Sequence, residues 1–180
     1  MPRRAQALQE FYGGPIWKAH REAANATLID SDNVLLLRPA RPTSGFSLEN
    51  TKRPPPGTQE ISNNLVVATI YYLEPSAGAD FVDFFERVLK PELINAGASI
   101  VAYFVTENHP NTFPALPVRE NVNVFVRFSH FPDRVAYEQH VAALADSTHW
   151  SNEITKALTG RLKVPREILR LSPTARSQLR

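Results

Sequence analysis

The sequence contains no cysteine among its 180 residues, and this absence removes several kinds of chemistry at once. Disulfide bonds, thiolate nucleophiles and zinc sites with thiolate ligands are excluded, so a metal would need histidine and carboxylate ligands. Long hydrophobic runs are also missing: residues 34–37 and 65–68 are far too short to cross a bilayer, and no apolar signal region follows Met1. We therefore expect a cytoplasmic protein without membrane insertion.

A strong excess of charge of either sign is missing as well. The chain has 20 Lys and Arg against 18 Asp and Glu, a formal charge of +2. Proteins that neutralise a nucleic-acid backbone gather their cations into a stripe, and here the cations form only short clusters, so no nucleic-acid partner is expected. Hydrophobic residues make up 43% and charged residues 21%, as in ordinary soluble domains and unlike fully disordered or collagen-like chains.

From residue 65 onward, predicted strands and helices alternate. Residues 65–73, 99–106 and 123–129 are rich in β-branched and aromatic side chains, which indicates strands, and residues 167–171 are interpreted as the final strand. Apolar residues at helical spacing predict a helix that begins at Phe81, kinks at Pro91 and is capped by Gly97, and further helices over 134–145 and 150–158. The order β-α-β-β-α-β predicts an α+β, ferredoxin-like unit, with both helices on one face of an antiparallel sheet and the other face bare.

The first part of the chain predicts helices over residues 3–11 and 16–25 and a strand over 34–37. A segment dense in Pro, Ser, Thr and Asn follows, which we interpret as a linker; its Pro triplet, 54–56, is a spacer rather than a ligand for an aromatic groove. We therefore predict a partial unit at 1–40, a linker at 41–61, a complete ferredoxin-like unit at 62–175 and a tail at 176–180.

The two ends of the chain carry a weak internal repeat. The offset that aligns Trp17 with Trp150 also aligns Phe11 with Leu144, and one further residue of slip places residues 34–39 on 168–173. Both tryptophans are expected to dock helices onto a core. Repeats of this kind indicate duplicated structural units, so residues 1–40 are interpreted as the end of a first unit.

Three segments together resemble NIPSNAP proteins, which belong to the dimeric α/β-barrel superfamily. They are residues 11–40, beginning FYGGPIWKAH, residues 84–107, FFERVLKPELINAGASIVAYFVTE, and residues 124–144, VFVRFSHFPDRVAYEQHVAAL. The family often carries two ferredoxin-like repeats, so the resemblance implies a chain truncated at its N-terminus. It also implies a homodimer that associates through sheet faces.

Strand parity predicts which side chains of the third strand face the helices. We expect the helices to meet Val122, Val124, Val126 and Phe128, and the open face to carry Asn123, Phe125, Arg127 and Ser129.

A polar row across the open face is the best candidate pocket. It would comprise Arg170, Tyr71, Arg127 and Tyr103, one residue from each strand. Such a row would hold an acidic, aromatic or quinone-like small molecule, because arginine binds carboxylate through two parallel hydrogen bonds. The alternative, favoured for polar residues on a sheet face, is a dimer or inter-repeat interface, where Tyr and Arg are also common.

The five histidines show no spacing typical of a helical metal site. Superfamily members that bind haem use a histidine, and His140 is a candidate for that role or for the pocket, although a surface or hydrogen-bonded histidine is the simpler interpretation. Glu107 and His109 would form an acid/base pair at a strand end, again against a simpler interpretation as ordinary loop residues. No cofactor and no metal are expected.

No catalytic motif is present, so the catalytic residues stay unknown. The sequence favours a non-catalytic binding or assembly module, a NIPSNAP-like protein of unknown activity. The alternative that the resemblance implies is a cofactor-independent, quinol-type monooxygenase that uses Tyr71, Tyr103, Arg127 and His140.

Overall fold

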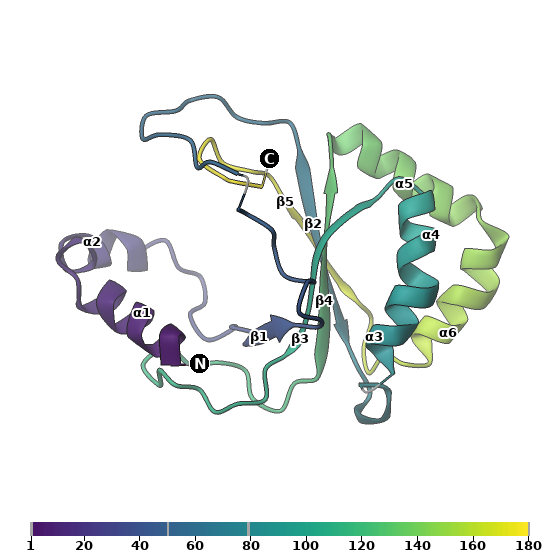
Figure 1. Cartoon of the computed structure of the whole chain (residues 1–180), viewed down its shortest axis with the longest axis horizontal. Helices are drawn as coiled ribbons and strands as arrows, with labels where there is room; N and C mark the ends of the chain where they lie inside the picture. Colours follow the sequence, from purple (N-terminus) through teal and green to yellow (C-terminus); the bar gives the residue numbers. More distant parts are fainter. Residues whose placement is uncertain (1, 50, 79, 180) are drawn as a thin grey trace. The chain divides into compact units, whose positions relative to one another are not determined.

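The computed structural model describes residues 2–49, 51–78 and 80–179, and the chain divides into two compact units (Figure 1). The first unit contains the described residues up to Leu37 together with Thr106–Val122. The second contains Arg38–Val105 and the residues from Asn123 onward. The segment predicted to be a linker, 41–61, therefore belongs to the second unit. The interpretation of residues 1–40 as a repeat remnant stays a prediction.

The sheet confirms the predicted ferredoxin-like topology. Its strands are β1 (Leu37–Pro39), β2 (Leu65–Tyr72), β3 (Ser99–Thr106), β4 (Val124–Phe131) and β5 (Glu167–Leu171), in the spatial order β1-β3-β4-β2-β5. The pairs β2–β4, β2–β5 and β3–β4 are antiparallel. Two strands differ in place from the prediction. β4 was predicted at 123–129 and extends to Phe131. The strand predicted at 34–37 begins at Leu37, because the Val34 carbonyl accepts a hydrogen bond from the Arg119 amide instead.

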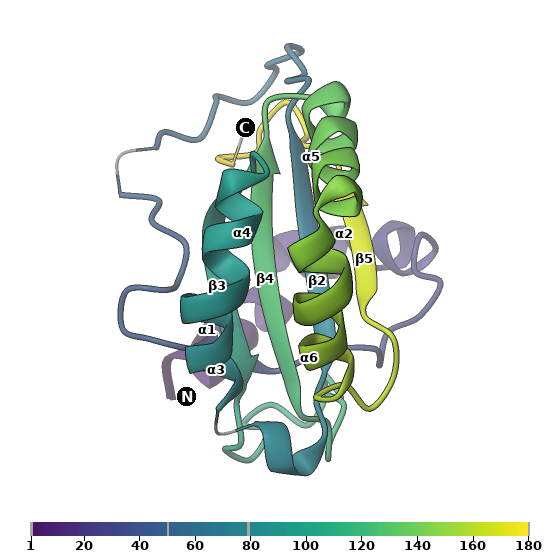
Figure 2. The same cartoon turned by 90° about the vertical axis from the view of Figure 1, so that its right-hand side faces the viewer.

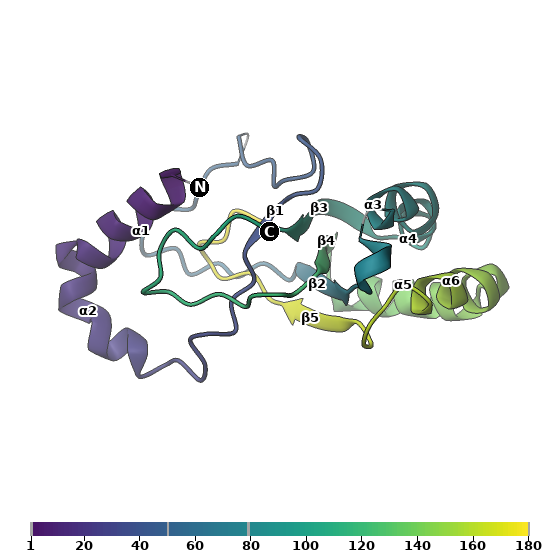
Figure 3. The ribbon, with the colours of Figure 1, turned by 90° about the horizontal axis from the view of Figure 1, so that it is seen from below.

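The helices of the second unit lie together on one face of the sheet (Figures 2 and 3). One group comprises α3 (Phe81–Phe84), a π-helical turn η2 (Phe85–Leu89) and α4 (Lys90–Asn95), which follow a 3₁₀ turn η1 (Pro75–Ala77). The other comprises α5 (Arg134–Asp146), a second π-helical turn η3 (Trp150–Ile154) and α6 (Thr155–Thr159). No helix within the described residues is long and apolar enough to cross a membrane.

Local sequence explains where these helices begin and end. The Asp133 side chain accepts a hydrogen bond of 2.7 Å from the Ala136 amide and so caps the start of α5. The widened turn η2 ends two residues before Pro91, which cannot donate a backbone hydrogen bond to the preceding turn. Gly97 has a φ of +96° and ends α4, as predicted, because this left-handed conformation is open to glycine.

The face of the sheet that meets the helices is the opposite of the one predicted from strand parity. Phe125 is fully buried, with its ring centroid 5.1 Å from that of Phe81 and 4.7 Å from that of Phe85. Phe128 instead packs against Phe46, at 4.9 Å, on the other face. The prediction was wrong because apolar residues occupy both faces of β4, so that alternation alone does not distinguish them.

The predicted bare face is partly covered by the Pro-rich segment. Phe46 contacts Phe104 and Phe128 through its ring, and the Ser44 hydroxyl donates a hydrogen bond of 2.8 Å to the Tyr103 carbonyl. The Ser44 carbonyl in turn accepts from the Tyr103 amide. This segment is thus attached to the edge of the sheet by both apolar and backbone contacts.

The first unit contains α1 (Pro2–Gly13), α2 (Pro15–Asn25) and the long connection that ends at Val122. Trp17 contacts Tyr12 edge to face, with centroids 4.9 Å apart, and Tyr12 stacks on Phe113 at 5.6 Å. Arg4 and Asn111 are joined by a hydrogen bond of 3.0 Å. Aromatic packing therefore joins α2 to α1 and α1 to the connection. Trp17 is only half-buried and α2 has no buried residue, so the predicted docking of Trp17 onto a buried core is not observed.

Candidate functional site

A cavity of about 260 Å³ lies between the sheet and α5. Its walls come from β2, β4, β5, α5 and the start of η3. The lining residues are Val67, Thr69, Tyr71, Arg127, Tyr137, His140, Val141, Leu144, Ala145, Trp150, Arg166 and Ile168. The walls thus combine apolar and polar side chains, and their charged side chains are two arginines. No described Asp or Glu lines the cavity.

Arg127 is the central group of this site. It is only 7% exposed, its Nε–H donates a hydrogen bond of 3.0 Å to the Tyr71 hydroxyl, and its Nη1 donates to the Ser129 hydroxyl. Among the described residues it has no carboxylate partner in an ion pair. Since buried charges are normally paired, this guanidinium is suited to receive an anion.

Two further polar groups of the cavity are available to a ligand. The Thr69 side chain is 1% exposed, and its Oγ1 has no hydrogen-bond partner. His140 Nδ1 lies 3.0 Å from the Ala96 carbonyl and donates its hydrogen there, which leaves Nε2 as an acceptor in the neutral ring. Burial lowers the pKa of His140, and the charge of Arg127 lowers it further, while the bond to Ala96 opposes this shift. His140 is therefore neutral at pH 7.

The structure brings together three of the five predicted pocket residues, Tyr71, Arg127 and His140. The four predicted row residues share one face, but the row itself was wrong. Thr69, not Tyr71, pairs with Arg127, and Ile168, not Arg170, pairs with Thr69. The sheet face that carries these residues is the one that meets the helices, and Tyr71, Arg127 and Tyr103 are buried there, while Arg170 is exposed.

Arg170 and Tyr103 do not line this cavity. Arg170 is exposed and pairs with Val67 in the sheet, while Tyr103 pairs with Arg127 on the far side of β4. Sequence reasoning missed Tyr137, Trp150 and Arg166 as lining residues. The sequence held a partial indication of two of them. Tyr137 lies within the amphipathic pattern of α5 and Trp150 follows that helix, and a helix places aromatic side chains of this kind against a sheet.

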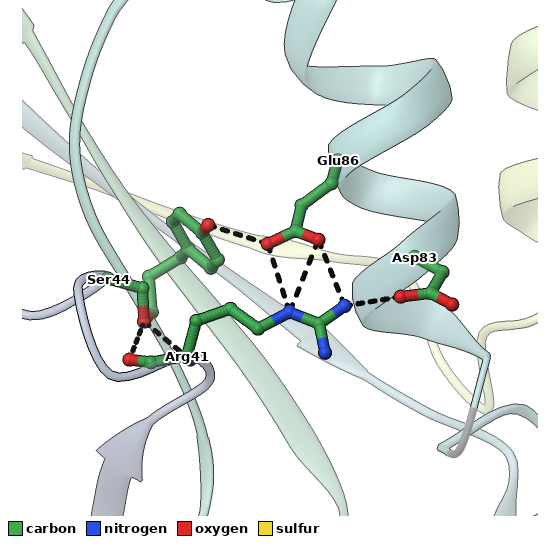
Figure 4. A network of polar contacts seen from close by, with 5 residues as sticks. Arg41, Ser44, Asp83 and Glu86 are labelled. Atoms are coloured by element: carbon green, nitrogen blue, oxygen red, sulfur yellow. Dashed lines mark hydrogen bonds and ion pairs between the residues drawn. The ribbon is translucent and has the colours of Figure 1, made fainter.

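Tyr103 instead belongs to a surface network with the Pro-rich segment (Figure 4). Its hydroxyl donates a hydrogen bond of 2.7 Å to Glu86, which also forms an ion pair of 2.9 Å with Arg41. Arg41 forms a second ion pair with Asp83. The hydrogen bonds from Arg41, more than that from Tyr103, lower the pKa of Glu86 against the effect of its desolvation. Because these side chains are partly exposed, the ion pairs contribute little stability, and the network chiefly positions the segment.

Tyr103 predicts a pH dependence of stability. Burial, followed by the hydrogen bond to Glu86, raises its pKa from 10.0 to about 12. The neutral phenol of Tyr103 therefore contributes fully to the free energy of unfolding below pH 10, and this contribution is lost as the pH rises through about 12. We expect Tyr103→Phe to flatten the fall of the unfolding free energy between pH 10 and 12, measured by urea denaturation. Tyr137→Phe is the control, and an equal effect in both variants would contradict this assignment.

The predicted Glu107–His109 pair exists in the first unit. His109 Nδ1 lies 2.6 Å from Glu107 Oε1, and the His109 amide donates to the same oxygen at 3.0 Å. Both residues line a hollow of about 270 Å³ in that unit. His109 is largely exposed. The described residues contain no cluster of three His, Asp or Glu side chains suited to a metal ion.

The fold and topology define an α+β protein with a ferredoxin-like antiparallel sheet. Solved structures with this fold include a NIPSNAP-like domain protein from Burkholderia xenovorans, 22% identical, with a TM-score of 0.52 over 64% of this chain and 89% of that one. They also include a NIPSNAP family protein from Agrobacterium tumefaciens, 17% identical, with a TM-score of 0.54 over 68% of this chain and 99% of that one.

A second NIPSNAP family protein from Agrobacterium tumefaciens is 17% identical, with a TM-score of 0.51 over 65% of this chain and 99% of that one. These likenesses show the fold and agree with the resemblance drawn from the sequence. No protein-family model matches the chain, and no curated protein matches it.

Proposed function

We propose that this protein is a binding module for a small aromatic acid, which occupies the cavity between α5 and the sheet. The observation that carries the proposal is the buried Arg127 guanidinium, which lines the cavity without a described carboxylate partner. An anionic ligand would supply the missing charge through hydrogen bonds that are stronger than those of neutral groups.

The size and walls of the cavity support a ligand with one aromatic ring. Drug-sized ligands occupy sites of roughly 300–1,000 Å³, and the volume of about 260 Å³ lies just below this range. Val67, Leu144 and Ile168 offer apolar surface, and Trp150 offers an aromatic one. Thr69 Oγ1 and the Tyr71 hydroxyl, whose own hydrogen is free to be donated, would bind a ring substituent or the acid itself.

Benzoate and its neutral analogue benzamide test the proposal directly. We expect benzoate to bind in a calorimetric titration and benzamide to bind much more weakly. Arg127→Gln should weaken benzoate about 10- to 100-fold, because a hydrogen bond to a charged group is lost. Arg134→Gln is the matched control, since Arg134 is exposed at the start of α5 and does not line the cavity. Equal binding of the two compounds, or unchanged binding in Arg127→Gln, would refute the proposal.

Association through sheet faces remains part of the proposed assembly role. Its support is the sheet face opposite the helices, where Leu169 and Leu171 of β5 are 40% and 43% exposed. Light scattering that reports a strict monomer at micromolar concentration would count against it. Oxygen uptake on addition of a ligand would favour the monooxygenase alternative over a purely binding role.

A further inference from the structure

A second cavity, of about 360 Å³, lies on the sheet face that points away from the helices. Its floor is formed by Val66, Phe128 and Leu171, which share this face through the pairings of β2 with β4 and β5. The remaining lining comes from the Pro-rich segment and from the residues after β5: Phe46, Leu48, Arg53, Ser172, Pro173, Ser177, Gln178 and Leu179. This cavity is separated from the α5 cavity by the sheet.

The chemistry of the lining favours an amphiphilic occupant. Apolar side chains dominate the walls, and an apolar space of this size offers water few hydrogen-bond partners. Arg53 is the one ionisable side chain among the described lining residues, and it is exposed. No described residue forms an ion pair with it. A molecule with an apolar body and one negative charge would satisfy both features.

The wall of the cavity opposite the sheet consists of two irregular segments that hold each other. Arg176 Nε donates a hydrogen bond of 3.1 Å to the Pro54 carbonyl, and Gln178 Nε2 donates at 3.3 Å to the Thr51 carbonyl and hydroxyl. The cavity is open toward solvent, so a ligand can enter without disturbing the sheet. The volume also falls within the usual range of roughly 300–1,000 Å³ for small-molecule sites.

We propose that this second cavity binds a medium-chain carboxylate or a similarly shaped amphiphilic acid. The alkyl chain lies against Phe46, Phe128 and Leu171, and the carboxylate lies at the rim beside Arg53. This site is independent of the acid site at Arg127, because the two cavities share no lining residue.

Octanoate and 1-octanol test this site, because they share the chain and differ in the charge. We expect both to bind the full-length protein in calorimetric titrations. Arg53→Gln should weaken octanoate about two- to fivefold, the range for an exposed charge pair, and leave 1-octanol unchanged. Leu48→Trp should weaken both, because it fills the cavity from a position that is 37% exposed and outside the buried core.

Two further variants make the outcome decisive. Arg87→Gln removes an exposed arginine from η2 that does not line the cavity, and it should leave octanoate binding unchanged. In Arg127→Gln, which removes the anion-binding group of the acid site, the octanoate binding that remains belongs to this cavity, so that failure of the acid site and failure of this site can be told apart. The proposal is overturned if octanoate does not bind, if Arg53→Gln and Arg87→Gln act alike, or if Arg127→Gln abolishes octanoate binding.

Discussion

Phe125→Ala is expected to destabilise the second unit by about 3–5 kcal/mol, the usual cost of removing a fully buried phenylalanine. The ring is 0% exposed and contacts four aromatic rings, those of Tyr71, Phe81, Phe85 and Tyr103. The surrounding rings come from two strands and a helix, so the cavity left behind cannot close by a shift of one element. Urea denaturation followed by circular dichroism measures the loss.

The control for this variant is Val135→Ala on α5, where the side chain is 59% exposed and the expected change is within about 0.5 kcal/mol. The comparison also tests which face of β4 meets the helices. If Phe125 lay on an open face, as strand parity alone suggested, its replacement would cost little more than that of Val135. A small and equal loss in the two variants would therefore contradict the observed core.

The fold could be predicted from the sequence because its signals are local and repeated. β2, β3 and β4 each have a run of β-branched or aromatic residues, and Asp133 and Gly97 mark a helix start and a helix end through contacts within a few residues. The element order then leaves few ways to arrange the chain, since four strands and two helices in this order form one antiparallel sheet. The arrangement of the strands in the sheet could therefore be predicted from the order of the elements along the chain, without knowledge of any contact between distant residues.

The orientation of β4 could not be predicted, because it depends on contacts between distant residues. Arg127 is a charged residue and was placed on the open face by default. In the structure its charge is accommodated inside by the hydroxyls of Tyr71 and Ser129, while Phe125, two residues before it, fills the helix-covered core. The alternating pattern of β4 was therefore correct, and only the assignment of its two faces was reversed.

The role of the Pro-rich segment was also beyond sequence reasoning. Its composition indicates a linker, yet Phe46 packs on the sheet and Arg41 forms ion pairs with η2 and α3. Single aromatic and charged residues in an irregular segment carry no periodicity, so nothing local distinguishes a docked segment from a free one. For the same reason the cavity near Arg53, which this segment helps to enclose, leaves no mark in the sequence.

Arg127→Met is expected to abolish benzoate binding without lowering stability in the unliganded protein. The buried guanidinium has hydroxyl partners but no described carboxylate, so its desolvation is not offset by an ion pair. Replacing poorly compensated buried charges with apolar side chains of similar length is often neutral or stabilising by about 1–4 kcal/mol. The loss of the hydrogen bonds to Tyr71 and Ser129 opposes this gain. We therefore expect the free energy of unfolding to stay the same or to rise by up to about 2 kcal/mol.

Arg127→Ala provides the matched comparison, because it removes the charge and also leaves a cavity, and it should be less stable than Arg127→Met by about 1–3 kcal/mol. Urea denaturation of the unliganded proteins and benzoate titration of each would be measured together. A large loss of stability in Arg127→Met would mean that Arg127 is held for structure, as in an ordinary buried hydrogen-bond network. Retained stability with lost benzoate binding is the result that a ligand-binding arginine predicts, because natural binding sites keep groups that destabilise the empty protein.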